Sequence, residues 1–302
     1  MHPTAAPGVQ LDLFADSRSV TLANDVVAAL LARDEDSASA ALAALSADDP
    51  QADSLPHFDV LVRALVAVRA TPADAPSIAA MAERIDREAA PVAQRVLGAA
   101  AGDFIRGLFA DLAEAARQLP FDPDWPQAHR ASLCLRCGLW AEAEEAARSI
   151  PAATTRADPL HWLTVAAYRQ RGLDAARPQL FALAWRAPQR IAATLRELDD
   201  ASLDRDWRRF AAASPWESVA DADLPTWFPA WYLLEHPMAG ADLDFIDAPE
   251  SPPAEAARLL RHIAGLERRG DWRAQAAQRE KLRALNAELF ALFMAQRSVA
   301  RR

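Results

Sequence analysis

The sequence predicts an all-α fold in which paired helices stack side by side as a solenoid. One passage occurs twice: residues 107–120 read GLFADLAEAARQLP and residues 138–151 read GLWAEAEEAARSIP, with eight of fourteen positions identical at an offset of 31. A fixed period in the low thirties is typical of helical repeat proteins. Alternating β-branched runs with hairpin turns, the usual sign of strands, do not occur in the sequence.

Glycine is scarce, and its positions predict where helices end. Four glycines each follow an apolar-periodic stretch and precede another: Gly107, Gly138, Gly172 and Gly270. Glycine readily adopts the left-handed conformation that ends a helix, so we interpret each as the stop between the two helices of a pair. Prolines then separate one pair from the next, at Pro120, Pro151 and Pro188.

The apolar periodicity predicts helices along nearly the whole chain. We expect them over 17–33, 37–47, 57–70, 77–100, 108–118, 126–137, 140–149, 159–171, 174–186, 189–198, 203–212, 226–236, 253–269 and 272–297. The predicted organisation is a tail with a linear motif over 1–16, helical repeats over 17–200, an irregular aromatic-rich segment over 201–250 and capping helices over 251–302.

The middle of the chain resembles the tetratricopeptide repeat family. The stretch RCGLWAEA over 136–143 is similar to the turn and second helix of that repeat, where Gly138, Trp140 and Ala143 fit a Gly-x-aromatic-x-x-Ala pattern, and Ala131 fits the small residue of the first helix. Outside this unit the alanine is replaced by Leu112, Arg177 or Gln275. The resemblance implies a single elongated right-handed superhelix that binds peptides or partner proteins in its concave groove.

Composition and charge narrow the class of protein. The formal net charge is −9, and the only basic run lies at 297–302, which disfavours direct nucleic-acid binding. The beginning of the chain lacks the pattern of a signal peptide, and no apolar run is long enough to span a bilayer. Abundant alanine and a single lysine, Lys281, indicate a GC-rich bacterial genome. We therefore expect a cytoplasmic bacterial protein with no membrane partner.

Sequence motifs that would indicate catalysis, redox chemistry or metal binding are weak throughout the sequence. Cys134 and Cys137 form a Cys-x-x-Cys pair, but they precede Gly138 at the expected C-terminal end of a helix, where the dipole disfavours a thiolate. An acidic group at Asp242, Asp244, Asp247 and Glu250 lacks the register of a calcium loop. No glycine-rich phosphate loop is present. We expect no catalytic residue, no cofactor and no metal site, and keep an enzyme on a helical-repeat frame as the rival class.

The aromatic-rich segment allows two interpretations. Eight aromatic residues gather within 207–247, together with four prolines. Aromatic clusters usually form core, so the segment is expected to seal the C-terminal helices against the rest. The alternative is an exposed aromatic groove for a partner, carried by Trp227, Phe228 and Trp231.

Leucines in the last predicted helix are spaced three, four and three residues apart, at Leu282, Leu285, Leu289 and Leu292. This spacing is typical of a coiled-coil seam. We expect the seam to pack on the preceding helix as a cap, and a dimer contact is the alternative.

The tail carries one short linear motif. Gln10-Leu11-Asp12-Leu13-Phe14 resembles the QLxLF pentapeptide with which bacterial polymerases and repair proteins bind the replication sliding clamp. The resemblance implies that Gln10 bonds the pocket rim while Leu11, Leu13 and Phe14 fill an apolar cleft of the clamp. The alternative is that these side chains fold back on the first helix as a hydrophobic staple. Together the patterns predict a non-enzymatic protein-binding scaffold, with a clamp-tethered accessory factor as the runner-up.

Overall fold

The structure is a computed structural model that describes residues 13–212, 219–240, 243–245 and 248–299. Within those ranges all regular secondary structure is helical, and no strand is found. The prediction of an all-helical fold is confirmed. By packing, the chain divides into two compact units, Met1–Gly138 and Leu139–Arg302.

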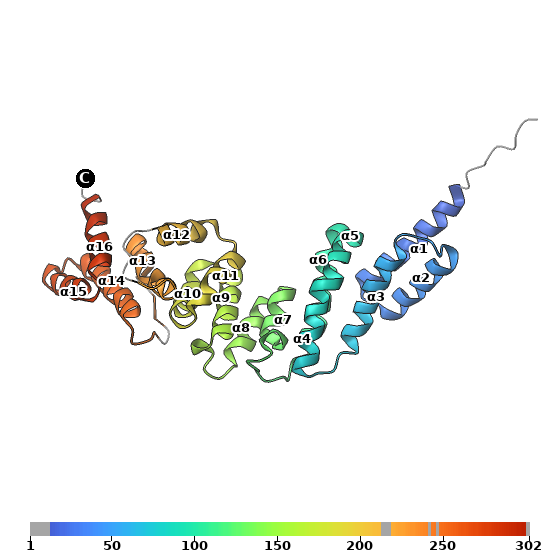
Figure 1. Cartoon of the computed structure of the whole chain (residues 1–302), viewed down its shortest axis with the longest axis horizontal. Helices are drawn as coiled ribbons and strands as arrows, with labels where there is room; N and C mark the ends of the chain where they lie inside the picture. Colours follow the sequence, from blue (N-terminus) through green and yellow to red (C-terminus); the bar gives the residue numbers. More distant parts are fainter. Residues whose placement is uncertain (1–12, 213–218, 241–242, 246–247, 300–302) are drawn as a thin grey trace, which may run out of the picture. The chain divides into compact units, whose positions relative to one another are not determined.

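Most consecutive helices of the first unit pack against one another (Figure 1). Its elements are α1 (Leu13–Ala32), α2 (Glu35–Asp48), α3 (Leu55–Arg69), α4 (Ala75–Arg84), a π-helical turn (Ile85–Ala89), α5 (Ala90–Leu97), a 3₁₀ turn (Gly98–Ala100), α6 (Ala101–Ala115), a 3₁₀ turn (Pro126–Ala128) and α7 (Arg130–Cys137). Asp34 and Asp74 cap α2 and α4, since their carboxylates accept the backbone N–H groups of Ser37 and Ser77.

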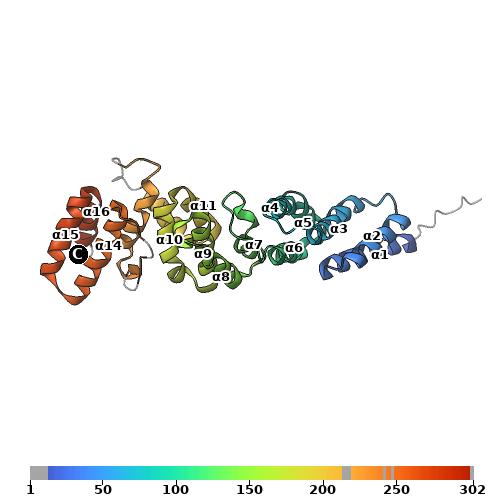
Figure 2. The ribbon, with the colours of Figure 1, turned by 90° about the horizontal axis from the view of Figure 1, so that it is seen from below.

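The second unit continues the same pattern of neighbouring helices. Its elements are α8 (Trp140–Arg148), a 3₁₀ turn (Ala153–Thr155), α9 (Ala157–Arg171), α10 (Leu173–Arg186), α11 (Pro188–Leu198), α12 (Ala201–Ala212), a 3₁₀ turn (Leu224–Trp227), α13 (Phe228–Glu235), a 3₁₀ turn (Pro237–Gly240), α14 (Pro252–Arg269), α15 (Trp272–Leu285) and α16 (Ala287–Val299). The last three helices lie together at the end of this unit (Figure 2).

Three of the four predicted glycine stops are confirmed. Gly138, Gly172 and Gly270 follow α7, α9 and α14 and have φ angles of 80°, 79° and 72°. A side chain at these angles would be strained, so glycine is the residue that lets each helix end there.

The prediction that Gly107 ends a helix is wrong, because this residue lies inside α6. A Cβ atom at this position would stand 2.6 Å from Cδ of Arg33. The Arg33 side chain crosses α6 here, where its Nη1 donates to the Gly107 carbonyl and to Asp111 Oδ1, both at 3.1 Å. Glycine is therefore required by close packing, and the backbone there stays helical.

The prediction of one helix over 272–297 is also wrong. The chain leaves the helical conformation at Asn286, whose φ is −155° and ψ is 105°, and its Oδ1 accepts the Leu289 N–H at 2.8 Å. The four leucines therefore belong to two helices, with Leu282 and Leu285 in α15 and Leu289 and Leu292 in α16. Leu282 and Leu289 are fully buried, but the seam does not run along one continuous helix.

Candidate functional site

The predicted clamp-binding motif lies largely outside the described residues. Gln10 and Leu11 precede them, while Leu13 and Phe14 form the first two positions of α1, where only the backbone is described. Whether the motif binds a partner or folds back as a staple stays a prediction.

The predicted aromatic groove residues lie in the core of the second unit. Trp227, Phe228 and Trp231 are 7%, 0% and 3% exposed. The Phe228 ring stacks on that of Trp231 with 6.3 Å between centroids, and it meets the Phe210 ring edge-on at 5.5 Å. These three side chains therefore do not form an open groove, and the structure agrees with the core interpretation.

The two cysteines are buried in the last turn of α7. Their position at the C-terminal end of that helix is as predicted, and they supply packing volume there. Of the acidic group, Asp244 and Glu250 are exposed, whereas Asp242 and Asp247 lie outside the described residues. In the described part of the chain, no three His, Cys, Asp or Glu side chains gather as a metal site would require.

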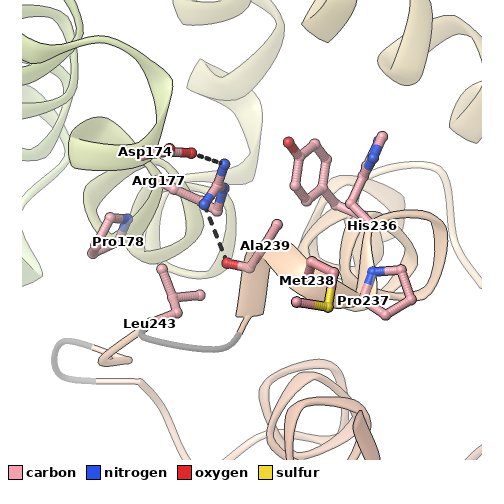
Figure 3. Close-up of a pocket in the computed structure, with 9 residues that line it drawn as sticks. Asp174, Arg177, Pro178, His236, Pro237, Met238, Ala239 and Leu243 are labelled. Carbon is pink, nitrogen blue, oxygen red and sulfur yellow. Dashed lines mark hydrogen bonds and ion pairs between the residues drawn. The ribbon is translucent and has the colours of Figure 1, made fainter. Parts of the chain in front are cut away.

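One hollow of the second unit lies beside α10 and the turn after α13 (Figure 3). Its volume is about 670 Å³, which is within the range of small-ligand and side-chain binding pockets. The lining residues are Asp174, Arg177, Pro178, Tyr232, His236, Pro237, Met238, Ala239 and Leu243. We call this hollow the Arg177 pocket.

Arg177 lies at the floor of the pocket. Its side chain is only 9% exposed, although the group is permanently charged. One guanidinium nitrogen donates to the Ala239 carbonyl at 3.1 Å, and the other donates to the Asp174 carboxylate (Figure 3). Its Nε is buried and has no hydrogen-bond partner among the described atoms. The bonds to Ala239 and Asp174 hold the guanidinium in one position and offset the cost of its burial.

Tyr232 and His236 form the opposite side of the pocket. Tyr232 is 5% exposed, and burial raises the pKa of its phenol. Its ring lies 5.6 Å from the Arg177 guanidinium and 4.5 Å from the His236 ring. The distance to Arg177 is within the range of a cation–π contact, so the tyrosine joins the arginine to the histidine.

His236 is fixed in turn by an acid on α12. Its Nε2 lies 2.8 Å from Oδ2 of Asp206, a residue that is itself buried. This pairing directs the Nε2 hydrogen toward the carboxylate and leaves Nδ1 as the nitrogen for other contacts. Arg177 and His236 each have an acidic partner, Asp174 and Asp206 respectively, so the pocket offers oriented hydrogen bonds more than excess charge.

The rim of the pocket is apolar. Met238 is 71% exposed in the turn after α13, and Pro178 and Pro237 also line the pocket. Pro178 lies inside α10, where its missing N–H removes the helical bond to the Asp174 carbonyl. The arrangement combines a polar floor with an adaptable apolar edge, and thioether side chains are suited to contacts with varied partners.

The sequence patterns did not predict these residues as a site, although the sequence contains one sign of it. Arg177 stands five positions after Gly172, where the repeat at Gly138 has Ala143. In the structure Ala143 is completely buried and Arg177 nearly so. An arginine at a position that packs a small residue elsewhere must find buried partners, and the departure from the repeat pattern marks the pocket.

Comparison with known proteins gives no further guide to this site. No protein family, no curated protein and no solved structure matches the chain. Of the helices in the described residues, none combines the length and the apolar character that crossing a membrane requires.

Proposed function

We propose that this chain is a non-enzymatic cytoplasmic scaffold that binds a partner protein, built as a tetratricopeptide-like solenoid. The support is twofold. Most neighbouring helices pack in sequence order within each unit, and glycine turns with positive φ link α9 to α10 and α14 to α15. Such helix pairs leave one surface of each pair available for recognition.

The observation that carries the proposal is the buried and fully oriented Arg177 at the floor of an open hollow. Arginine and tyrosine are, with tryptophan, enriched among the side chains that dominate binding at protein interfaces, and here they present oriented polar groups at the floor of the hollow. Here both are held rigidly before any partner arrives, which lowers the entropy lost on binding. The exposed Met238 extends the contact area at the rim.

A pair of matched substitutions tests this proposal. Met238→Asp places a charge at the pocket rim, and Met294→Asp places the same charge on α16, where Met294 is 43% exposed and does not line the pocket. Each tagged protein is used for affinity purification from the cells of origin, followed by mass spectrometry. We expect a partner that the wild type and Met294→Asp retain and Met238→Asp loses. Identical sets of captured proteins for all three would contradict the proposal.

The pentapeptide at 10–14 supports a second candidate, an accessory factor tethered to the replication sliding clamp. All the defining positions of the QLxLF pattern are present. The test is a titration of purified bacterial clamp with the wild type and with the Leu13→Ala/Phe14→Ala variant. Loss of clamp binding with an unchanged melting temperature would support the tether. Absence of binding by the wild type, or a lowered melting temperature of the variant, would favour the staple.

A further inference from the structure

Helix α14 presents a basic face that no run of basic residues in the sequence reveals. Its members, which we call the α14 basic face, are Arg258, Arg261, His262, Arg268 and Arg269. Their spacings of three, one, six and one residues place all five on one side of a helix. The opposite side of α14 is apolar and buried, with Leu260 and Ile263 among its core residues.

A hollow of about 740 Å³ lies along this face. Gly265, in the middle of the face, has no side chain to fill it. Phe245 forms an aromatic wall, since its ring lies 5.2 Å from the Arg261 guanidinium. Asp244 is the one acidic residue among the residues that line the hollow.

Two of the arginines are fixed by backbone groups. Arg258 donates to the carbonyls of Ala248 and Pro249 at 3.1 and 3.2 Å, and Arg261 donates to the Leu243 carbonyl. Carbonyl oxygens orient a guanidinium but do not neutralise its charge. Arg258 also pairs with Glu255 at 3.0 Å, so within the described residues it is Arg261 that keeps the floor of the hollow positive.

The other two arginines are available for an incoming anion. Arg268 and Arg269 are exposed, and in the described ranges neither forms an ion pair with an acid. Their neighbour Glu267 turns to the far side of the helix, where it pairs with Arg279 and Arg297. Among the residues that the structure describes, these two guanidiniums therefore stand without an acidic partner at one end of the hollow, next to Arg261.

We propose that the α14 basic face binds an acidic segment of a partner protein, with Asp or Glu carboxylates paired to Arg268 and Arg269. A guanidinium matches a carboxylate through two parallel hydrogen bonds, and the Phe245 wall accepts an apolar side chain between the acids. A nucleic acid needs a longer basic track along its phosphates, and the chain's net charge of −9 repels a long polyanion. This surface shares no lining residue with the Arg177 pocket, and the proposal for it does not rest on the function proposed for that pocket.

The test uses the purified full chain and three fluorescein-labelled probes. The first is a short peptide that alternates Glu with Leu, the second has Gln in place of every Glu, and the third is a single-stranded DNA oligonucleotide of the same charge as the first. Binding is followed by fluorescence anisotropy. The variant Arg268→Gln/Arg269→Gln is compared with Lys281→Gln/Arg283→Gln, which removes the same charge from exposed positions of α15 outside the hollow.

We expect the Glu peptide to bind the wild type and the α15 variant equally and to bind the α14 variant at least about fivefold more weakly. The Gln peptide should not bind. Equal binding of the Glu peptide to the two variants, no difference between the Glu and Gln peptides, or tighter binding of the oligonucleotide would each overturn the proposal. Because the peptide comparison uses the wild-type protein alone, it holds even if a variant fails to fold.

Discussion

A buried carboxylate, Glu144, joins α8 to α9, and its removal gives the sharpest test of the energetics. Its Oε1 accepts from Arg148 and, at 2.9 Å, from Arg171, and its Oε2 accepts from Arg171 at 2.9 Å and Gln170 at 2.8 Å. The pKa of the Glu144 carboxyl is lowered from 4.5 to about 2, and the hydrogen bonds from Arg171 are the largest cause. Burial of the carboxyl acts in the opposite direction and raises the pKa. The folded state therefore favours the ionised form.

The magnitude follows from the pKa. A fall from 4.5 to about 2, at about 1.4 kcal/mol for each pKa unit, gives an upper bound of about 3.4 kcal/mol. The Arg148 and Arg171 side chains are 57% and 46% exposed, so solvent screens part of the attraction, and about 2 kcal/mol is a realistic value. Glu144→Gln should reduce the free energy of unfolding by that amount at neutral pH.

The pH dependence has a definite sign. The folded pKa lies below the unfolded one, so the stabilisation is fully present above 4.5 and is lost as the pH falls toward 2. The difference between wild type and Glu144→Gln should therefore shrink below 4.5.

Urea unfolding followed by tryptophan fluorescence measures this difference, because every tryptophan except Trp125 lies in the second unit. The control is Glu145→Gln, an exposed residue of the same helix, with an expected change within about 0.5 kcal/mol. A Glu144→Gln effect no larger than the control, or one that stays constant below 4.5, would refute the reasoning.

Two further predictions concern the first unit, and unfolding followed by circular dichroism checks both. His129 caps α7 through Nδ1, and burial is the main cause that lowers its pKa from 6.5 to about 4. Because the folded state resists protonation of this histidine, wild-type stability should fall as the pH drops from 6.5 to 4. The fall should be smaller in His129→Asn, since asparagine caps the helix but does not titrate. A parallel pH dependence of the two proteins would contradict this. Gly107→Ala forces Arg33 away from α6, whereas at Gly102 an added Cβ meets only the mobile tip of Arg106, at 3.3 Å. Gly102→Ala should therefore stabilise the helix by up to about 1 kcal/mol. The Gly107→Ala protein should be less stable than the Gly102→Ala protein by about 1–2 kcal/mol. Equal stabilities of the two variants would count against the packing explanation.

The glycines show how far the sequence determines the fold. At Gly138, Gly172 and Gly270 the cause of the glycine is local backbone conformation, which apolar periodicity on both sides makes visible. At Gly107 the cause is Arg33, which is distant in the sequence, and a packing constraint of that kind leaves no local signal. Sequence reasoning therefore predicted the helical class and most helix ends, but not which glycines serve packing.

The wrong prediction of one continuous helix across Asn286 has a different cause from the error at Gly107. The leucine spacing continues unchanged across it, so periodicity predicted one helix. An asparagine that caps the next helix was the only local sign, and such a residue is also tolerated within helices.

The candidate site was visible only as a departure from the repeat. Arg177 replaces a small buried residue, yet its partners come from separate elements: Ala239 from the turn after α13 and Tyr232 from α13 itself. The α14 basic face follows a helical spacing, and a search for consecutive basic residues overlooks it. A helical projection of the charges in 252–269 would have found it.

Each hollow has an arginine that holds one backbone carbonyl in place. Arg177 from α10 holds the Ala239 carbonyl, and Arg261 from α14 holds the Leu243 carbonyl. Leu243 also lines the Arg177 pocket, so a ligand that shifts this residue would act on both hollows, and the two binding equilibria would be thermodynamically linked. The cycle that connects them requires each occupant to change the other's dissociation constant by the same factor.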